Sequence, residues 1–326
     1  MEEKTVTIEK KSKDRKTARI FLAGSFGAIV FLIFLAIGYR EFPRLWQKLF
    51  EPVTVVSRQF STGELTPTAT PSLRTLNFKK EIEKMLVPLR GEYGIYYYDL
   101  ITKETFSING QRQFQAASLN KMPLLVTLYQ LADAGKINLD TIYQLRAEDK
   151  RAGAGSLAGR PEGYKITYRQ MAELMGQQSD NTAFNILSHL VGEKKVQEVI
   201  DNLGMKNTSF ADWAMTPEDL GLLFRKLYQE KIVSDKSRDE ILNYLTNTIW
   251  ETRIPAGLPK GVRVAHKIGS EVGVVSDAGI IFAQRPFVLV IMSEDVNEIE
   301  AGKALPEITA KIYAWHEGIS YVTPTP

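Results

Sequence analysis

The stretch Ser118–Ala134 reads SLNKMPLLVTLYQLADA and opens with a serine and a lysine three residues apart. Its apolar residues are nearly continuous from residue 122 to 131 and Gly135 follows, so we expect a buried helix that ends there. A spacing of i and i+3 places Ser118 and Lys121 side by side on one helix face. The helix start also offers free backbone N–H groups, which favour an oxyanion. The stretch therefore predicts a hydroxyl beside an amine in buried surroundings.

The chemistry of lysine explains why this pairing matters. A serine hydroxyl is a poor nucleophile until a base takes its proton. A desolvated lysine can be that base, because burial and a nearby cation lower its pKa. A serine and a lysine at this spacing usually mark an ordinary helix start, but the apolar run and Pro123 in the first turn favour a buried site. Ser118 is therefore the candidate nucleophile and Lys121 the candidate base.

A second motif, Ser179-Asp180-Asn181, joins two predicted helices, one capped by Thr167 and the other spanning residues 181–191. Asp and Asn commonly cap helices, so a plain capping loop is the alternative for this motif taken alone. A serine hydroxyl can relay a proton to a leaving group, and an asparagine amide can hold a substrate carbonyl. We therefore expect Ser179 to be a catalytic hydroxyl and Asn181 to bind substrate.

A third motif, Lys267-Ile268-Gly269, lies on a strand predicted over residues 262–268. Alternation places Lys267 and Gly269 on one face and His266 on the other, where we interpret the histidine as packing. Gly269 allows a ligand close to the backbone, and the N–H of Ser270 is a candidate oxyanion donor. Lys267 is then the candidate cation near the base, although a solvated edge-strand lysine is the alternative for this segment alone.

The three motifs in this order resemble those of class A β-lactamases and related penicillin-interacting serine hydrolases. The likeness covers residues 77–321 and extends to the flanking runs FQAAS (114–118), GSL (155–157), DNTA (180–183) and IPAGLP (254–259). It implies an α/β sandwich with the active site between two subdomains. It also implies a set of roles: nucleophile Ser118, base Lys121, proton relay Ser179, substrate amide Asn181 and electrostatic Lys267.

The element pattern of the same region indicates the α/β class, in the form of an α+β sandwich. Strand patterns occur at residues 93–100 and 104–108, and they return at 262–268, 274–283 and 286–292. Helix patterns occur at residues 78–89, through the middle and at 297–315. Strands at both ends of the domain predict an antiparallel sheet built from both chain ends and flanked by helices. The helical middle is then an inserted all-helical subdomain, and the folded domain spans residues 77–321.

Composition excludes several classes of site. The net charge of +3 is too small to indicate a nucleic-acid partner. The chain has no cysteine, so disulfides, thiolate catalysis and cysteine metal sites are excluded. Its histidines are His189, His266 and His316, and their spacing does not indicate a metal site. We therefore expect no metal or cofactor, and the sequence does not predict an oligomeric state.

The first 76 residues predict a membrane attachment. Residues 20–39 carry no charge and reach about 30 Å as a helix, the hydrocarbon thickness of a bilayer. The second half of the tail at residues 1–19 contains six basic residues and one acidic residue, Asp14. The positive-inside rule therefore predicts that the tail stays in the cytoplasm. Residues 40–76 include the Ser-, Thr- and Pro-rich run STGELTPTATPS and form an extracytoplasmic tether. A cleaved signal peptide is the alternative, but its apolar core is shorter and no cleavage site stands out.

One departure from the family pattern concerns release of the acyl group. The lactamase branch carries a glutamate in an E-x-x-L-N loop, which activates the water that releases the acyl-enzyme. Here Trp213 resembles the residue before that glutamate, Ala214 stands in its place and no E-x-x-L-N occurs. The nearby carboxylates are Asp212 and Glu218, which we interpret as a turn residue and a first-turn helix acid. Hydrolysis of the acyl-enzyme is therefore expected to be slow.

A second departure concerns recognition of the substrate carboxylate. Ile268 replaces the hydroxyl residue that helps to bind it, and Ser270 is a partial replacement. An arginine usually found on the following strand is also missing, with Ser276 and Asp277 in that region.

Three functional hypotheses follow. The leading one is a single-pass membrane protein whose extracytoplasmic domain is a β-lactamase-like serine hydrolase acting on β-lactams or related amides. The second is a penicillin-binding-type peptidase or esterase acting on cell-wall peptides. The third is a pseudo-enzyme that binds a wall ligand or a partner without turnover.

Overall fold

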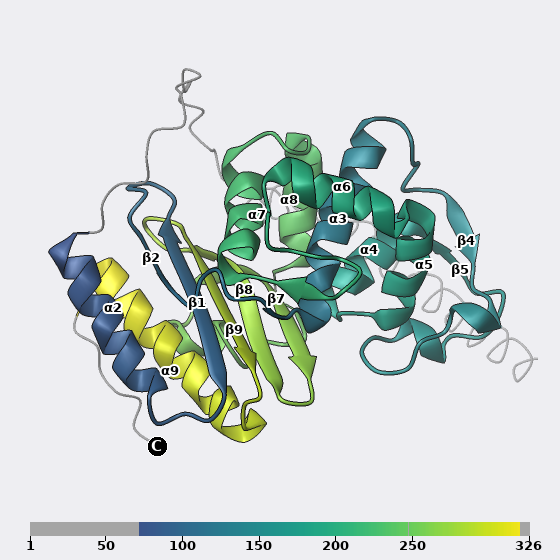
Figure 1. The fold of residues 1–326 in the computed structure, drawn as a ribbon. Coiled ribbons are helices and arrows are strands. Elements are labelled where there is room, and N and C mark those ends of the chain that lie inside the picture. The colour runs from purple at the N-terminus through teal and green to yellow at the C-terminus, as the bar shows by residue number, and fades with distance from the viewer. Residues whose placement is uncertain (1–71, 247, 320–326) are drawn as a thin grey trace, which may run out of the picture. The chain divides into compact units, whose positions relative to one another are not determined.

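The structure is a computed structural model that describes residues 72–246 and 248–319. Its centre is a five-stranded antiparallel sheet with the order β2-β1-β9-β8-β7 (Figure 1). The strands are β1 (Glu92–Asp99), β2 (Thr105–Ile108), β7 (Arg263–Glu271), β8 (Val274–Phe282) and β9 (Phe287–Glu294). The two early strands pair with the three late ones through β1 and β9. The predicted sheet from both ends of the domain is confirmed.

One face of the sheet is covered by α2 (Leu73–Leu86) and α9 (Glu298–Glu317) (Figure 1). Alternation along β1 sends Ile95 and Tyr97 into the core beneath these two helices, and Tyr96 and Tyr98 into the core on the opposite face. The helix predicted from residue 78 begins five residues earlier, because Ser72 caps it by accepting a hydrogen bond from the Thr75 N–H.

The other face of the sheet carries α7 and the helical subdomain. The helices on this side of the sheet are α3 (Lys121–Asp133), α4 (Tyr168–Gln177), α5 (Asn181–Val191), α6 (Glu193–Leu203), α7 (Pro217–Gln229) and α8 (Asp235–Tyr244). The capping signals fix three of the starts: Thr167 and Gln170 form a capping box, Thr216 caps α7 before Pro217, and Ser234 caps α8. The predicted helical insertion is confirmed.

The expected single helix over residues 118–134 is wrong in its first turn. Ala117–Asn120 form a 3₁₀ turn, η1, and α3 starts only at Lys121. Ala117 has a φ of 45°, which turns the chain sharply before Ser118. A 3₁₀ turn has three residues per turn, so residues i and i+3 still lie above one another. The predicted neighbourhood of Ser118 and Lys121 therefore survives the change of helix type.

Two short pairings carry no periodic signal and were not predicted. β3 (Phe114–Gln115) pairs with β6 (Ala214–Met215), and β4 (Ile142–Gln144) pairs with β5 (Lys165–Thr167). The first pairing matters for the site. Together with the hydrogen bond from the Ala116 N–H to the Trp213 carbonyl, at 2.7 Å, it ties the approach to Ser118 to the segment before α7.

Within the described residues, no helix is both long and apolar enough to cross a membrane. The basic tail, the predicted anchor at residues 20–39 and residues 40–71 of the tether lie outside the described part of the chain.

Candidate active site

The structure brings the three sequence motifs together. The Lys121 Nζ lies 3.0 Å from the Ser118 Oγ and 3.1 Å from the Ser179 Oγ. The Lys267 Nζ lies 2.8 Å from the same Ser179 Oγ, from the opposite side of the site. A continuous series of hydroxyl and amine contacts therefore joins η1, the turn before α5 and strand β7.

Lys121 is held in conditions that favour its neutral form. Its side chain is 2% exposed. Its Nζ also lies 2.5 Å from the Ser179 carbonyl oxygen and 2.8 Å from the Asn181 Oδ1. Burial lowers the pKa of Lys121 to about 7, with partial opposition from the charge of Asp180. An amine that titrates near neutral pH is suited to take a proton from a hydroxyl.

The second motif is fixed by a loop that approaches it closely. Asp180 caps α5 by accepting the Ala183 N–H, and its second oxygen accepts the Leu157 N–H, both at 2.8 Å. Asn181 donates its backbone N–H to the Ala154 carbonyl and its side-chain amide to the Ala152 carbonyl, both at 2.9 Å. Ser179 itself has a φ of 57°, a strained backbone region for a non-glycine residue. The loop thus holds Ser179 and Asn181 in their places.

The third motif lies on β7, packed against η1. Lys267 is buried, and burial together with the charge of Lys121 lowers the pKa of Lys267 well below its ordinary value. A Cβ on Gly269 would lie 2.9 Å from the Ala116 carbonyl oxygen, so only glycine lets β7 come this close to η1. Ser270 follows at an exposed position. The close approach expected for Gly269 is made to the nucleophile's own turn.

Arg253 completes the site and was missed in the sequence. It comes from the segment before β7, and one guanidinium nitrogen, Nη1, donates to the carbonyls of Gly269 at 2.8 Å and Ser276 at 2.6 Å. Its Nη2 donates to the Ser270 Oγ at 2.5 Å. The family pattern has an arginine on the strand that follows the third motif, which is β8 here. In this chain Arg253 comes from a different segment, and its guanidinium contacts β8 at the Ser276 carbonyl. The available signal was its position directly before the IPAGLP run.

Aromatic rings lie near Lys121. The Phe184 ring centre lies 5.6 Å from the Lys121 Nζ and 5.4 Å from the Trp213 ring. Phe210 is 6.2 Å from Phe184. In the described part of the chain, none of the hydrogen bonds of Ser118, Lys121 or Ser179 side chains goes to a carboxylate.

The carboxylates of Asp212 and Glu218 accept hydrogen bonds from serine side chains that do not belong to the candidate site. The Asp212 Oδ2 accepts a hydrogen bond from the Ser209 Oγ at 2.7 Å. The Glu218 Oε1 accepts one from the Ser107 Oγ at 2.7 Å, in the first turn of α7. Their interpretation as a turn residue and a helix acid agrees with these contacts.

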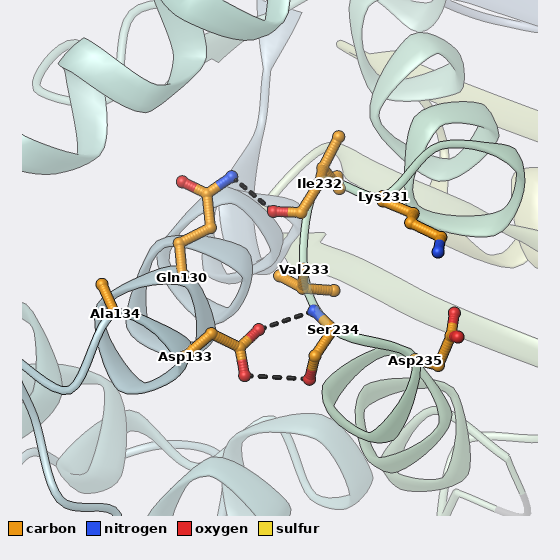
Figure 2. Close-up of a pocket in the computed structure, with 8 residues that line it drawn as sticks. All are labelled: Gln130, Asp133, Ala134, Lys231, Ile232, Val233, Ser234 and Asp235. Carbon is orange, nitrogen blue, oxygen red and sulfur yellow. Dashed lines mark hydrogen bonds between the residues drawn. The ribbon is translucent and has the colours of Figure 1, made fainter.

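A pocket of about 580 Å³ lies away from these residues, between the end of α3 and the start of α8 (Figure 2). One of its two carboxylates, Asp133, faces Ser234 and accepts hydrogen bonds from the Ser234 N–H at 2.6 Å and the Ser234 Oγ at 2.9 Å. These bonds tie α8 to α3. We therefore assign this hollow a structural role and place the candidate site at Ser118.

A sequence model of the Beta-lactamase enzyme family matches residues 77–316, almost the whole described domain. The chain belongs to this family. It is a β-lactamase-like serine hydrolase, with the candidate nucleophile, base and relay inside the matched region. β-Lactamase VEB-1 of Pseudomonas aeruginosa is 25% identical over 269 residues, which are 73% of this chain and 90% of VEB-1.

Solved structures of this family have the same fold. PBP-A matches with a TM-score of 0.72 and 27% identity, over 77% of this chain and 99% of PBP-A. A leucine-to-glutamate mutant of PBP-A was solved as an acyl-enzyme complex with penicillin G, and it matches with a TM-score of 0.73. A β-lactamase from Sphaerobacter thermophilus matches with a TM-score of 0.70 and 30% identity, over 75% of this chain and 98% of that one.

Proposed function

We propose that the chain is a membrane-anchored, extracytoplasmic serine hydrolase that forms an acyl-enzyme on Ser118 with β-lactams or related amides and releases it slowly. The observation that carries the proposal is the continuous contact from Ser118 through Lys121 and Ser179 to Lys267. A nucleophile, a second hydroxyl and two buried amines in this sequence of contacts suit serine acylation.

Acylation begins with neutral Lys121, which takes the Ser118 proton as the Ser118 Oγ attacks the substrate carbonyl. We assign the oxyanion to the backbone N–H groups of Ser118 and Ser270. The Ser179 hydroxyl passes its proton to the leaving nitrogen and receives in its place the proton that Lys121 took from Ser118, so Lys121 is neutral again. Lys267 donates to the Ser179 Oγ at 2.8 Å and stabilises that oxygen while it gives up its proton. The Asn181 amide keeps one N–H for a substrate carbonyl, since the other is donated to Ala152.

Recognition of a substrate carboxylate is assigned to Arg253 and Ser270. Arg253 places a guanidinium beside the exposed Ser270 hydroxyl, at the open end of β7. The remaining Nη2 N–H of this guanidinium and the Ser270 hydroxyl together suit a carboxylate oxygen, and the positive charge adds to the attraction. This pair stands in for the hydroxyl that Ile268 lacks.

Deacylation is the slow step in this proposal. The segment that would carry the glutamate has Ala214, and next to it the Trp213 ring lies 5.4 Å from the Phe184 ring, which is itself 5.6 Å from the Lys121 Nζ. Water then reaches the ester without a carboxylate base, and a well-placed base contributes about 10²–10⁴-fold to such a step. The likeness to PBP-A, trapped as a penicillin G acyl-enzyme in a mutant, supports the same order of events.

Intact-mass measurement of the full-length protein with penicillin G tests the acylation. We expect one covalent penicillin per chain, mapped to the peptide that contains Ser118 and absent from Ser118→Ala. A fluorophosphonate probe that labels Ser118 while penicillin G does not would retain the serine hydrolase and reject the β-lactam substrate. Failure of both reagents would support a binding protein without catalysis.

A cell-wall peptidase is the second candidate, and the edge position of β7 favours it. The first half of β7 is covered, because the His266 N–H donates to the Leu245 carbonyl and Ala265 bridges to Thr246. Residues 267–271 lie at the sheet edge beyond that cover. An extended peptide can add to such an edge as a further strand. Release of peptides from muropeptides by the native protein, lost in Ser118→Ala, is the result that would favour this candidate.

A further inference from the structure

His266 lies on β7 with its ring on the face opposite to Lys267, and it is 1% exposed. Its Nδ1 is 2.8 Å from the Asp277 Oδ1 of β8, and its Nε2 is 3.3 Å from the Glu251 Oε1. The Thr248 hydroxyl lies 3.2 Å from the same Nε2. Because carboxylate oxygens only accept hydrogen bonds, a carboxylate beside each ring nitrogen favours the protonated ring, an imidazolium that donates to both. The contacts replace the packing role expected from the sequence with a buried ionic bridge.

Both carboxylates of the bridge also hold the segment at residues 248–254. The second oxygen of Asp277, Oδ2, accepts the Ile254 N–H at 3.0 Å. Glu251 accepts the Thr248 hydroxyl at 3.0 Å, and that hydroxyl in turn accepts the Trp250 N–H at 3.1 Å. The two ends of the segment are therefore fixed to the same imidazolium.

Arg253 lies between these two fixed ends. Its guanidinium reaches from the segment to the carbonyls of β7 and β8 and to the Ser270 hydroxyl. A long side chain is held in one rotamer only when its backbone is held as well. Release of the segment from His266 would leave the guanidinium free to leave Ser270.

We propose that His266 is a positioning residue, whose imidazolium bridges Asp277 and Glu251 and thereby holds Arg253 beside Ser270 for recognition of the substrate carboxylate. The inference rests on the proposed function of the Ser118 site. The bridge lies on the other face of β7 from Lys267, so it acts on recognition and leaves the acylating groups in place.

The bridge has a defined pH range. Burial acts to lower the pKa of His266, but Asp277 and Glu251 outweigh it and raise that pKa to about 9. The charged groups that face the ring are Asp277 from β8 and Glu251 from the segment, and Asp277 also interacts electrostatically with Arg253 and Lys267. A raised pKa means that the bridge is complete below the ordinary histidine pKa and is lost as pH rises through about 9.

The test compares penicillin G with its methyl ester, which lacks the carboxylate, in the full-length protein. The ratio of their acylation rate constants isolates carboxylate recognition, because Lys121 and Ser179 act equally on both. Glu251 is 46% exposed, so Glu251→Gln removes the negative charge from one arm of the bridge without stranding a buried charge, and its amide oxygen is a weaker acceptor for the imidazolium. We expect this variant to lower the ratio about 5–10-fold while the ester reacts at the native rate. Glu198→Gln, an exposed carboxylate paired with Lys195 on α6, is the matched control.

The readout that a purely structural role would not move is the pH dependence of the acid-to-ester ratio, compared with the NMR titration of the His266 ring. We expect His266 to titrate near pH 9 in the native protein and at lower pH in Glu251→Gln, with the acid-to-ester ratio falling at the same lower pH. A His266 titration that moves while the ratio stays constant overturns the inference. Absence of acylation by either compound would instead count against the proposed function.

Discussion

Lys121 faces more acceptors than an ammonium group can serve. Four oxygens lie within 3.1 Å of its Nζ, whereas an ammonium has three protons to donate. A neutral amine has one lone pair and two N–H groups, so it can accept the Ser118 hydroxyl proton while it donates to two of the three Ser179 and Asn181 oxygens. The contacts therefore suit the neutral amine that a pKa of about 7 makes available as a base.

The rate of acylation should therefore rise with pH through about 7 and then level off. The pKa of Lys121 is lowered, so the neutral base is scarce at pH 6 and prevalent at pH 8. Lys121→Ala should lower the acylation rate by about 10²–10⁴-fold. Stopped-flow acylation with penicillin G between pH 5 and 8 checks both, with Lys195→Ala on the exposed surface of α6 as the control. A flat profile would exclude Lys121 as the base.

Ala214 is the position at which one residue should change the outcome of the reaction. The resemblance places the water-activating glutamate there, and Ala214 is half-buried next to Trp213. We expect Ala214→Glu to shorten the lifetime of the penicillin adduct by about 10-fold or more, toward the range that a positioned base contributes. The decay of the adduct by intact mass measures it, with Ala214→Gln as the uncharged control. Equal lifetimes in the two variants would contradict this role for position 214.

At the scale of elements, the site depends on the contact between β7 and η1. Gly269 lies against the Ala116 carbonyl and the Leu119 side chain, directly beside the nucleophile's turn. Lys267 and Ser270 are carried by the same strand. A shift of β7 therefore moves the cation, the recognition hydroxyl and an oxyanion donor together.

Gly269→Ala should consequently disable acylation. Its Cβ would lie 2.9 Å from a backbone oxygen and 3.0 Å from the Leu119 Cγ, so β7 must move away from η1. A displacement of this kind costs about 10²-fold in rate. Gly302→Ala on α9 is the matched control, because nothing lies within 4 Å of its Cβ and it should stabilise the helix by about 0.5–1 kcal/mol. Acylation rates and thermal unfolding of the two variants distinguish catalytic geometry from stability.

Local signals in the sequence predicted most elements, and long-range contacts account for what was missed. Thr167, Thr216 and Ser234 start helices because capping depends on residues three positions away. Arg253 meets Ser270 and Ser276 only after the strand folds back, and no spacing rule encodes that contact. The ring of Phe184 reaches Trp213 for the same reason. The 3₁₀ form of η1 depends on the positive φ of Ala117. Alanine rarely adopts a positive φ, so the sequence did not predict this turn.

At the scale of the whole molecule, the central sheet separates the two helices α2 and α9 from the helices that carry the candidate site. α2 and α9 close one face of the sheet (Figure 1). Phe78 of α2 stacks on Trp315 of α9 with ring centres 4.5 Å apart. The other face carries α7 and α3, and the site lies where the edge strand β7 meets η1. Sequence reasoning predicted this arrangement because strands recur at both ends of the domain.

The proposed anchor is a claim about the whole chain and has its own test. Residues 20–39 are uncharged and follow a basic tail, so the full-length protein should sediment with membranes and resist extraction by alkaline carbonate. Protease added to intact cells stripped of their wall or outer membrane should digest the domain and spare the tail. Recovery of the full-length protein in the soluble fraction would contradict the anchor, and a shortened soluble form would indicate a cleaved signal peptide.

The central claim is that the acylating half of the site is present and the water-activating half is absent. A time course of intact mass after mixing the full-length protein with a slight excess of penicillin G tests it most directly. We predict rapid formation of one adduct on Ser118 that persists long after free penicillin is exhausted. Complete conversion of penicillin to its hydrolysed product, with unmodified protein throughout, would contradict the account.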